Sequence, residues 1–111
     1  MSLPDFALTA LRLKATQILI RAAREEEPTR SARSNRAKNV IWPIRQFKQN
    51  PDGTWFAYGL SNSGRHTSLG FERDLCDCPD SRRKPSNRLN FPCKHKISMA
   101  YAILNYKQNE E

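Results

Sequence analysis

Apolar positions recur with a helical period in the first quarter of the chain. Between residues 4 and 26 they return every three or four residues, which places them on one face of a helix. Pro4 and Asp5 suit the first turn of such a helix, and Pro28 ends the pattern. We therefore predict an N-terminal amphipathic helix within residues 1–27. Its stripe comprises Leu8, Leu11, Ala15, Ile18 and Ala22, widened by Phe6 and Leu19.

The next segment, residues 28–39, has no large apolar side chain and carries four positive charges. Such a composition buries too little apolar surface to offset the entropy lost on ordering. We therefore predict a flexible basic linker. Its arginines recur every three residues, at Arg30, Arg33 and Arg36, so a nucleic-acid-binding arm and a plain linker both fit the pattern.

Residues 40–75 change to a pattern typical of strands, with aromatic residues and alternation. The turn sequences Asn-Pro-Asp-Gly at 50–53 and Asn-Ser-Gly at 62–64 divide this region. Three strands follow, at residues 40–47, 54–60 and 67–75. Because the connections are short, we expect an antiparallel meander.

A second helical pattern runs from about residue 95 to residue 106, with Ile97, Ala100, Tyr101 and Leu104 on one face. Residues 107–111 are expected to be loose. The predicted fold class is α+β: an N-terminal helix, a three-stranded antiparallel meander, a metal-tied loop and a C-terminal helix. The main domain covers residues 40–106.

The strongest chemical signal is a group of sulfur and imidazole donors near the C-terminus. Cys76 and Cys78 form a Cys-x-Cys pair, and Cys93 and His95 form a Cys-x-His pair after a gap of fourteen residues. Alternate side chains of an extended segment point the same way, so the first pair can reach one ion. Three thiolates and one imidazole are the closed tetrahedral ligand set of a structural zinc ion. We predict one bound Zn²⁺.

Other interpretations of these residues remain. The cysteines can be core residues beside a surface histidine, or His66 can replace His95 as the fourth ligand. Iron–sulfur clusters more often use four cysteines, and this chain has three. An odd number of cysteines also argues against a self-contained disulfide framework.

The charge of the chain is uneven. Its formal net charge is +8, and the excess falls between residues 28 and 96, which attracts polyanions. A basic loop lies between the ligand pairs. The candidate nucleic-acid contacts are Arg82, Arg83, Lys84, Arg88, Lys94 and Lys96, together with Arg30, Arg33 and Arg36. Exposed Trp55, Phe56 or Tyr58 would add stacking on unpaired bases, although core positions are the alternative for these rings.

The sequence shows neither a signal peptide nor an apolar run long enough to span a membrane. We therefore expect a cytoplasmic or nucleoid-associated protein without a membrane partner, in the host cell if it is phage-encoded. Paired carboxylates, a Ser–His arrangement and a phosphate loop are also absent from the sequence, so we expect no enzymatic activity.

The segments Leu-Cys-Asp-Cys-Pro-Asp at 75–80 and Phe-Pro-Cys-Lys-His-Lys-Ile at 91–97 resemble the SWIM zinc finger. The family pattern is Cys-x-Cys, a variable gap and Cys-x-His, and the resemblance covers about residues 40–106. It implies one zinc on the four matching residues, a short antiparallel sheet with a helix, and roles in DNA binding or protein interaction. The chain is similar to small stand-alone SWIM proteins of bacterial, phage or mobile-element type.

Two functional hypotheses follow. The first is a zinc-stabilised module that binds nucleic acid, with DNA favoured over RNA, through the loop between the ligand pairs. The second is a protein-interaction adaptor, such as a phage or mobile-element accessory factor that docks on a larger enzyme. In the second case the apolar face of the N-terminal helix would serve as docking element or homodimer interface.

Overall fold

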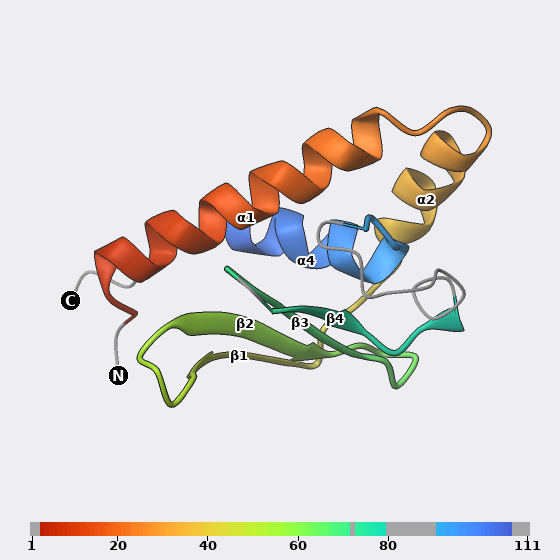
Figure 1. Cartoon of the computed structure of the whole chain (residues 1–111). Coiled ribbons are helices and arrows are strands. Elements are labelled where there is room, and N and C mark those ends of the chain that lie inside the picture. The colour runs from red at the N-terminus through yellow and green to blue at the C-terminus, as the bar shows by residue number, and fades with distance from the viewer. Residues whose placement is uncertain (1–2, 72, 80–90, 108–111) are drawn as a thin grey trace.

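The helices of this protein lie over one face of an antiparallel sheet (Figure 1). The computed structural model describes residues 3–71, 73–79 and 91–107. Three helices, labelled as in Figure 1, are α1 (Asp5–Ala23), α2 (Thr29–Ala37) and α4 (Lys94–Leu104). The strands are β1 (Ile44–Gln49), β2 (Trp55–Leu60), β3 (His66–Gly70) and β4 (Asp74–Cys76). The predicted α+β class is confirmed.

The four strands follow one another across the sheet in the order β1-β2-β3-β4. The register places Phe47 opposite Ala57, Ala57 opposite Leu69, and Leu69 opposite Asp74. This row faces the helices. The core forms where Ala57 and Leu69 meet the buried faces of α1 and α4. The helical residues in this core are Leu8, Leu11, Ala15 and Ile18 of α1 and Met99, Ala100 and Ile103 of α4.

The predicted third strand, residues 67–75, is two strands. Gly70 and Arg73 exchange backbone hydrogen bonds, at 2.6 and 3.4 Å, and close a hairpin between β3 and β4. A Cβ atom at Gly70 would lie 2.8 Å from Cβ of Phe56, so this position accepts only glycine without a shift. The sequence alternation runs through the hairpin without interruption, which is why the turn was not predicted.

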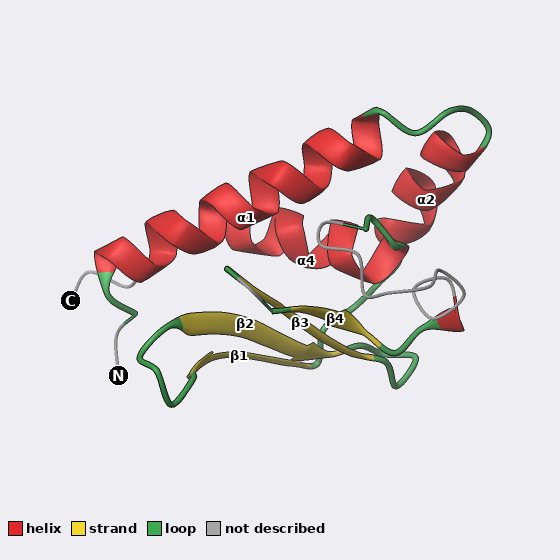
Figure 2. Ribbon diagram, viewed as in Figure 1, coloured by secondary structure: helices red, strands yellow, loops and turns green. Residues whose placement is uncertain are grey.

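Residues 28–39 are not the linker that their composition predicts, because α2 occupies most of them. Tertiary contacts order this helix. Ala37 is buried with Ala22 and Ile97, and Arg33 pairs with Glu25 at 2.9 Å. Figure 2 shows α2 folded back beside α4 after the turn that follows α1.

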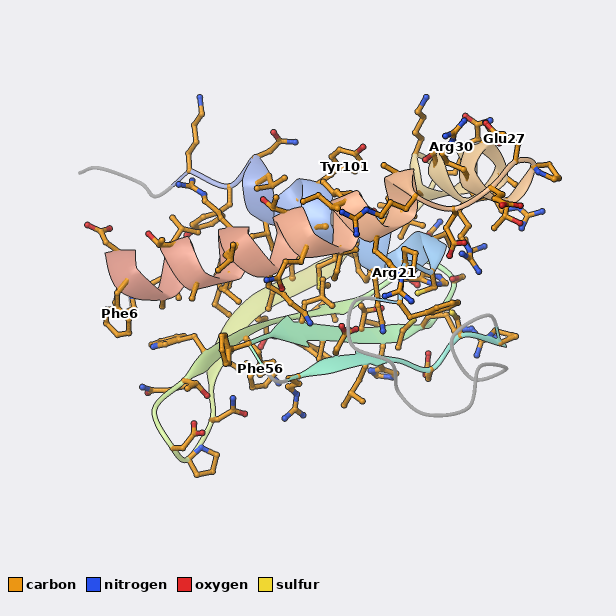
Figure 3. All side chains as sticks on the ribbon, turned by 45° about the horizontal axis from the view of Figure 1, so that its top comes forward. Phe6, Arg21, Glu27, Arg30, Phe56 and Tyr101 are labelled. Atoms are coloured by element: carbon orange, nitrogen blue, oxygen red, sulfur yellow. The ribbon has the colours of Figure 1, made fainter. Side chains whose placement is uncertain are left out.

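The first turn of α2 is held by Glu27. Its carboxylate accepts the backbone N–H of Ser31 at 3.0 Å and the Ser31 hydroxyl at 2.7 Å. It also pairs with Arg30, and the two side chains lie next to each other in Figure 3. These hydrogen bonds, those from Ser31 first, lower the pKa of Glu27 to about 2. Glu27 therefore satisfies helix N-terminal donors that α2 cannot satisfy itself.

Candidate metal centre

Two structural elements bring the four predicted ligands together. Cys76 ends β4, and Cys78 follows two residues later. Cys93 has an extended backbone directly before α4, and His95 lies in the first turn of that helix. The three sulfur atoms and a ring nitrogen of His95 all lie within 4.8 Å of one another. In a tetrahedral zinc site such donors stand roughly 3.5–3.8 Å apart, so a small contraction would close this group around one ion.

The centre is shielded from water. Cys78, Cys93 and His95 are at most 2% exposed, and Phe91 packs against the sulfur atoms. Thr67 donates a hydrogen bond to Sγ of Cys76 at 3.4 Å. The ring of His95 meets the ring of Trp42 edge to face, with centroids 6.4 Å apart.

The imidazole of His95 gives the strongest indication that these residues fit a metal ion. Neither of its ring nitrogens has a hydrogen-bond partner of good geometry within the described part of the chain, although the side chain is 98% buried. A buried polar group without a partner is costly and rare in native proteins. A metal ion among the three sulfur atoms would supply the partner, so the residues fit a metal site.

Without a cation, the sulfur atoms oppose one another's ionisation. The neighbouring sulfurs of Cys76 and Cys78, followed by burial, raise the pKa of the Cys93 thiol far above its ordinary value. Burial lowers the pKa of His95, but the same two sulfurs outweigh it and raise that pKa to about 9. A divalent cation would reverse this situation by favouring thiolates and a neutral imidazole.

The alternative ligand His66 lies outside the donor group. It is exposed, its Nδ1 lies 2.6 Å from the Tyr58 hydroxyl, and its backbone N–H donates to Asp77. The interpretation of a surface histidine beside core cysteines is also wrong for His95, because that side chain is buried among the sulfurs.

One predicted nucleic-acid contact, Lys96, is wrong. Its side chain is 2% exposed, and its ammonium group pairs with Oδ1 of Asp74. Oδ2 of the same carboxylate pairs with Lys14 of α1 at 2.8 Å. Lys96, like His95, lies on the side of α4 that faces the sheet. Phosphate therefore cannot reach its ammonium group.

The other predicted cations divide into three groups. Arg82, Arg83, Lys84 and Arg88 lie outside the described residues. Arg33, Arg36 and Lys94 line one hollow of about 740 Å³ next to the metal ligands Cys78 and His95. Arg30 lies apart from it, exposed and paired with Glu27.

Sequence reasoning missed Arg65, which lines the same hollow from the connection between β2 and β3. Its guanidinium donates to the carbonyl of Asp77 at 3.3 Å. Only the general excess of positive charge pointed to this residue, because no local pattern relates the β2–β3 turn to α2. None of the described residues that line the hollow is acidic.

The candidate stacking rings are mostly covered. Trp55 packs against the main core. Phe56 is buried, with the guanidinium of Arg73 at 4.2 Å from its ring centre. Tyr58 is half-buried, with the ammonium of Lys48 at 4.5 Å. These rings therefore contribute mainly to the packing of the sheet and not to a surface on which bases could stack.

Among the described helices, none has the length and apolar character that crossing a membrane requires. Comparisons of the chain with protein-family models, with curated proteins and with solved structures find no match. The geometry alone therefore assigns the site: Cys76, Cys78, Cys93 and His95 form a group that can hold one metal ion, with Cys76 half-buried and the other three buried.

Proposed function

We propose that this chain is a zinc-stabilised, SWIM-type module that binds DNA through the cationic surface around its metal centre. One observation carries the zinc assignment: three cysteine sulfurs, two of them buried, lie within 4.8 Å of a buried imidazole whose nitrogens lack hydrogen-bond partners within the described residues. Soft thiolates with one imidazole favour zinc over magnesium or calcium, which prefer oxygen ligands. Four protein ligands leave no open position for a reactive water, so the ion is structural and the module is not an enzyme.

The order of ligands supports the SWIM assignment. The Cys-x-Cys pair leaves the last strand of a small antiparallel sheet, and the Cys-x-His pair begins the helix that packs on it. This arrangement agrees with the sheet and helix that the family resemblance implies.

Net charge also favours zinc at this position. Two buried lysines and one aspartate, Lys14, Lys96 and Asp74, carry a formal charge of +1. Zn²⁺ with three thiolates carries −1. The two clusters adjoin, because Asp74 and Cys76 share one face of β4 and Lys96 follows His95. Together they leave no net charge in the interior, where an uncompensated charge is costly.

The metal assignment is tested by elemental analysis of protein purified without added metal, where we expect one zinc per chain. His95→Gln should lose the zinc and most of the cooperative thermal transition, because structural zinc contributes on the order of 10 kcal/mol to folding. His66→Gln is the matched control and should keep both. Full zinc content in the His95→Gln variant would reject the site.

Nucleic-acid binding rests on the concave cluster of Arg36, Arg65 and Lys94 beside the metal. Cations from α2, the β2–β3 turn and α4 converge there without a described acidic neighbour in the lining. Phosphate groups would neutralise them, and the released counterions give salt-dependent affinity. The basic residues within 82–88 lie between Cys78 and Lys94 in the sequence, and we expect them to contact phosphate groups as well.

A titration with duplex and single-stranded DNA at two salt concentrations tests this function. If about five phosphates are neutralised, log affinity should fall against log salt with a slope near −4 to −5. The double variant Arg36→Glu with Arg65→Glu should weaken binding strongly while zinc content stays at one. Arg21→Glu with Arg24→Glu on α1 changes the net charge equally and serves as control. Equal losses in both variants would contradict a specific surface.

A second candidate function, protein interaction, is favoured by an exposed apolar stripe on α1. Phe6, Leu13 and Ile20 are 72%, 55% and 46% exposed. Their seven-residue spacing places them on one line, opposite the buried face of the helix. Figure 3 shows Phe6 at the start of α1 and Arg21 near its end.

The occupant that we propose for this stripe is α1 of a second copy. In an antiparallel pair centred on Leu13, Phe6 meets Ile20 of the other copy and no like charges oppose each other. A parallel pair would stack Arg21 and Arg24 on themselves. Sedimentation equilibrium should show a dimer that Leu13→Glu converts to a monomer, with unchanged helicity as control. A wild-type monomer across the concentration range would reject self-association.

A further inference from the structure

Within the part of the chain that the structure describes, the edge of the sheet formed by β1 is open. β1 has six residues and pairs there only with β2, while the strand at the other edge, β4, has three. Asn50 donates its backbone N–H to the carbonyl of Thr54 at 2.7 Å. This bond shows which residues of β1 direct their backbone N–H and C=O groups toward β2: every second residue counted back from Asn50. By alternation, the backbone N–H and C=O groups of Arg45, Phe47 and Gln49 point away from β2. An edge of this length is a template for another strand.

A hollow of about 650 Å³ lies next to this edge, between β1 and the second half of α4. This volume is in the range of ligand-binding pockets, roughly 300–1,000 Å³. Its apolar lining includes Phe47, Ala57, Met99 and Ile103. Tyr106 forms one side of the hollow. Its ring packs edge to face against the ring of Phe47, with ring centres 4.8 Å apart.

The edge and the hollow fit each other geometrically. A strand added to β1 would direct every second side chain toward the helix layer. Phe47 of β1 already points that way, since it packs against the core and lines the hollow. Alternate side chains of the added strand would therefore enter an apolar space beside Met99 and Ile103.

The rim of the hollow is positively charged. Arg45 and Lys107 line it, and Lys48 lies on the same strand, on the outer face of the sheet. None of the described lining residues is acidic. Carboxylates on the outward-facing side chains of the added strand would meet Lys48, and the combined positive charge of Arg45, Lys48 and Lys107 would repel a lysine- or arginine-rich segment.

We propose that the β1 edge is a docking site for an extended, acidic segment of a partner protein. The segment adds a fifth strand to the sheet, places apolar side chains in the hollow and pairs acidic side chains of its other face with Lys48, while Arg45 and Lys107 add to the positive field that favours an acidic segment. Backbone hydrogen bonds supply affinity and the hollow supplies selectivity, as in other recognition by strand addition. This site needs neither DNA binding nor self-association through α1.

The test uses the zinc-loaded full chain and a fluorescent peptide of about ten residues in which valine or leucine alternates with glutamate. Anisotropy should show saturable binding, and NMR should show shifted amides at Arg45, Phe47 and Gln49. A second peptide with lysine in place of glutamate should bind at least about ten-fold more weakly. Absence of saturable binding, or equal binding of both peptides, would overturn the proposal.

Two variants locate the site. Arg45→Pro removes an outward-facing N–H without breaking a bond to β2, and Ala102→Phe fills the hollow from α4. Each should weaken peptide binding by about ten-fold or more. Ala10→Phe, on the exposed face of α1, is the matched control for added bulk. Unchanged affinity of both Arg45→Pro and Ala102→Phe, with an intact thermal transition, would place the peptide elsewhere and reject the β1 edge.

Discussion

Lys14 and Asp74 form an ion pair of 2.8 Å in the interior, with side chains only 4% and 1% exposed. The pair joins α1 to β4, two elements far apart in the sequence. Lys96 of α4 contacts the same carboxylate and also donates to the Asp74 carbonyl at 3.3 Å. One carboxylate thus connects both main helices to the strand that carries the first metal ligand.

Removing the shared carboxylate should be strongly destabilising. Asp74→Asn leaves two buried ammonium groups without a counter-charge, and breaking a buried pair in this way costs about 3–5 kcal/mol. The free energy of unfolding in urea measures the loss. Glu26→Gln removes an exposed carboxylate and should change it little. A loss below about 1 kcal/mol for Asp74→Asn would contradict the buried arrangement.

Replacing Lys14, Asp74 and Lys96 together by apolar residues separates the structural role of this buried cluster from its charge. Lys14→Met, Asp74→Leu and Lys96→Met together should cost much less folding stability than Asp74→Asn alone, because apolar groups can substitute for a buried ion cluster. The zinc–thiolate group then loses a neighbouring charge of +1. Asp74 and Cys76 stand two residues apart on β4, which is about 7 Å along a strand. At such a separation and an effective dielectric constant near 20, the lost attraction is on the order of 2 kcal/mol, or about thirty-fold in zinc affinity. A competition titration with a chelator measures it, and wild-type affinity would contradict the charge compensation.

The candidate metal ligands were predictable because their identities and spacing carry the information. Cys76 and Cys78 stand two apart on extended chain, and His95 lies in the first turn of a helix that its apolar stripe already indicated. The burial of Lys14 and Lys96 was not predictable in this way. A lysine ordinarily indicates an exposed position, and only the long-range meeting with Asp74 makes the interior acceptable for it.

Helix α2 shows the same limit of local reasoning. Its residues contain too little apolar surface to order themselves, so the prediction of a linker followed from composition. The structure orders them through partners elsewhere: Ala37 packs on Ile97, and the guanidinium of Arg33 lies 4.8 Å from the ring centre of Phe91. Tertiary contacts outweigh weak local propensity here.

Lys94 and Lys96 are neighbouring cations with opposite expected roles. Lys94→Gln should leave the melting temperature unchanged, weaken DNA binding and make the salt slope shallower by about 1. Lys96→Gln should lower the melting temperature and change the salt slope little in the folded fraction. Calorimetry with DNA titration separates the two effects. Equal salt slopes for Lys94→Gln and wild type would remove Lys94 from the DNA surface.

Glu27 makes the first turn of α2 sensitive to acid. Its pKa is lowered from 4.5 to about 2 in the folded state, so its contribution is present above pH 4.5 and is lost as the pH falls toward 2. NMR titration of side-chain carboxyl carbons checks this. The signal of Glu27 should stay that of a carboxylate at pH 4, where an ordinary glutamate is about 70% protonated. A midpoint near 4.5 for Glu27 would contradict the hydrogen bonds to Ser31.

Gly59 sets how closely α4 approaches the sheet. A Cβ atom there would lie 2.6 Å from Cε of Met99 and 2.6 Å from the ring of Trp42, while Trp42 is anchored to Ser98 of α4 by a hydrogen bond of 2.9 Å. Gly59→Ala should therefore overpack the interface and cost about 1–3 kcal/mol of unfolding free energy. Met99→Ala removes one clashing atom, so the same glycine substitution should cost less in that background, and a double-mutant cycle in urea measures the difference. Strict additivity of the two substitutions would show that Gly59 and Met99 do not meet, and the packing of α4 that places His95 beside the cysteines would then need another cause.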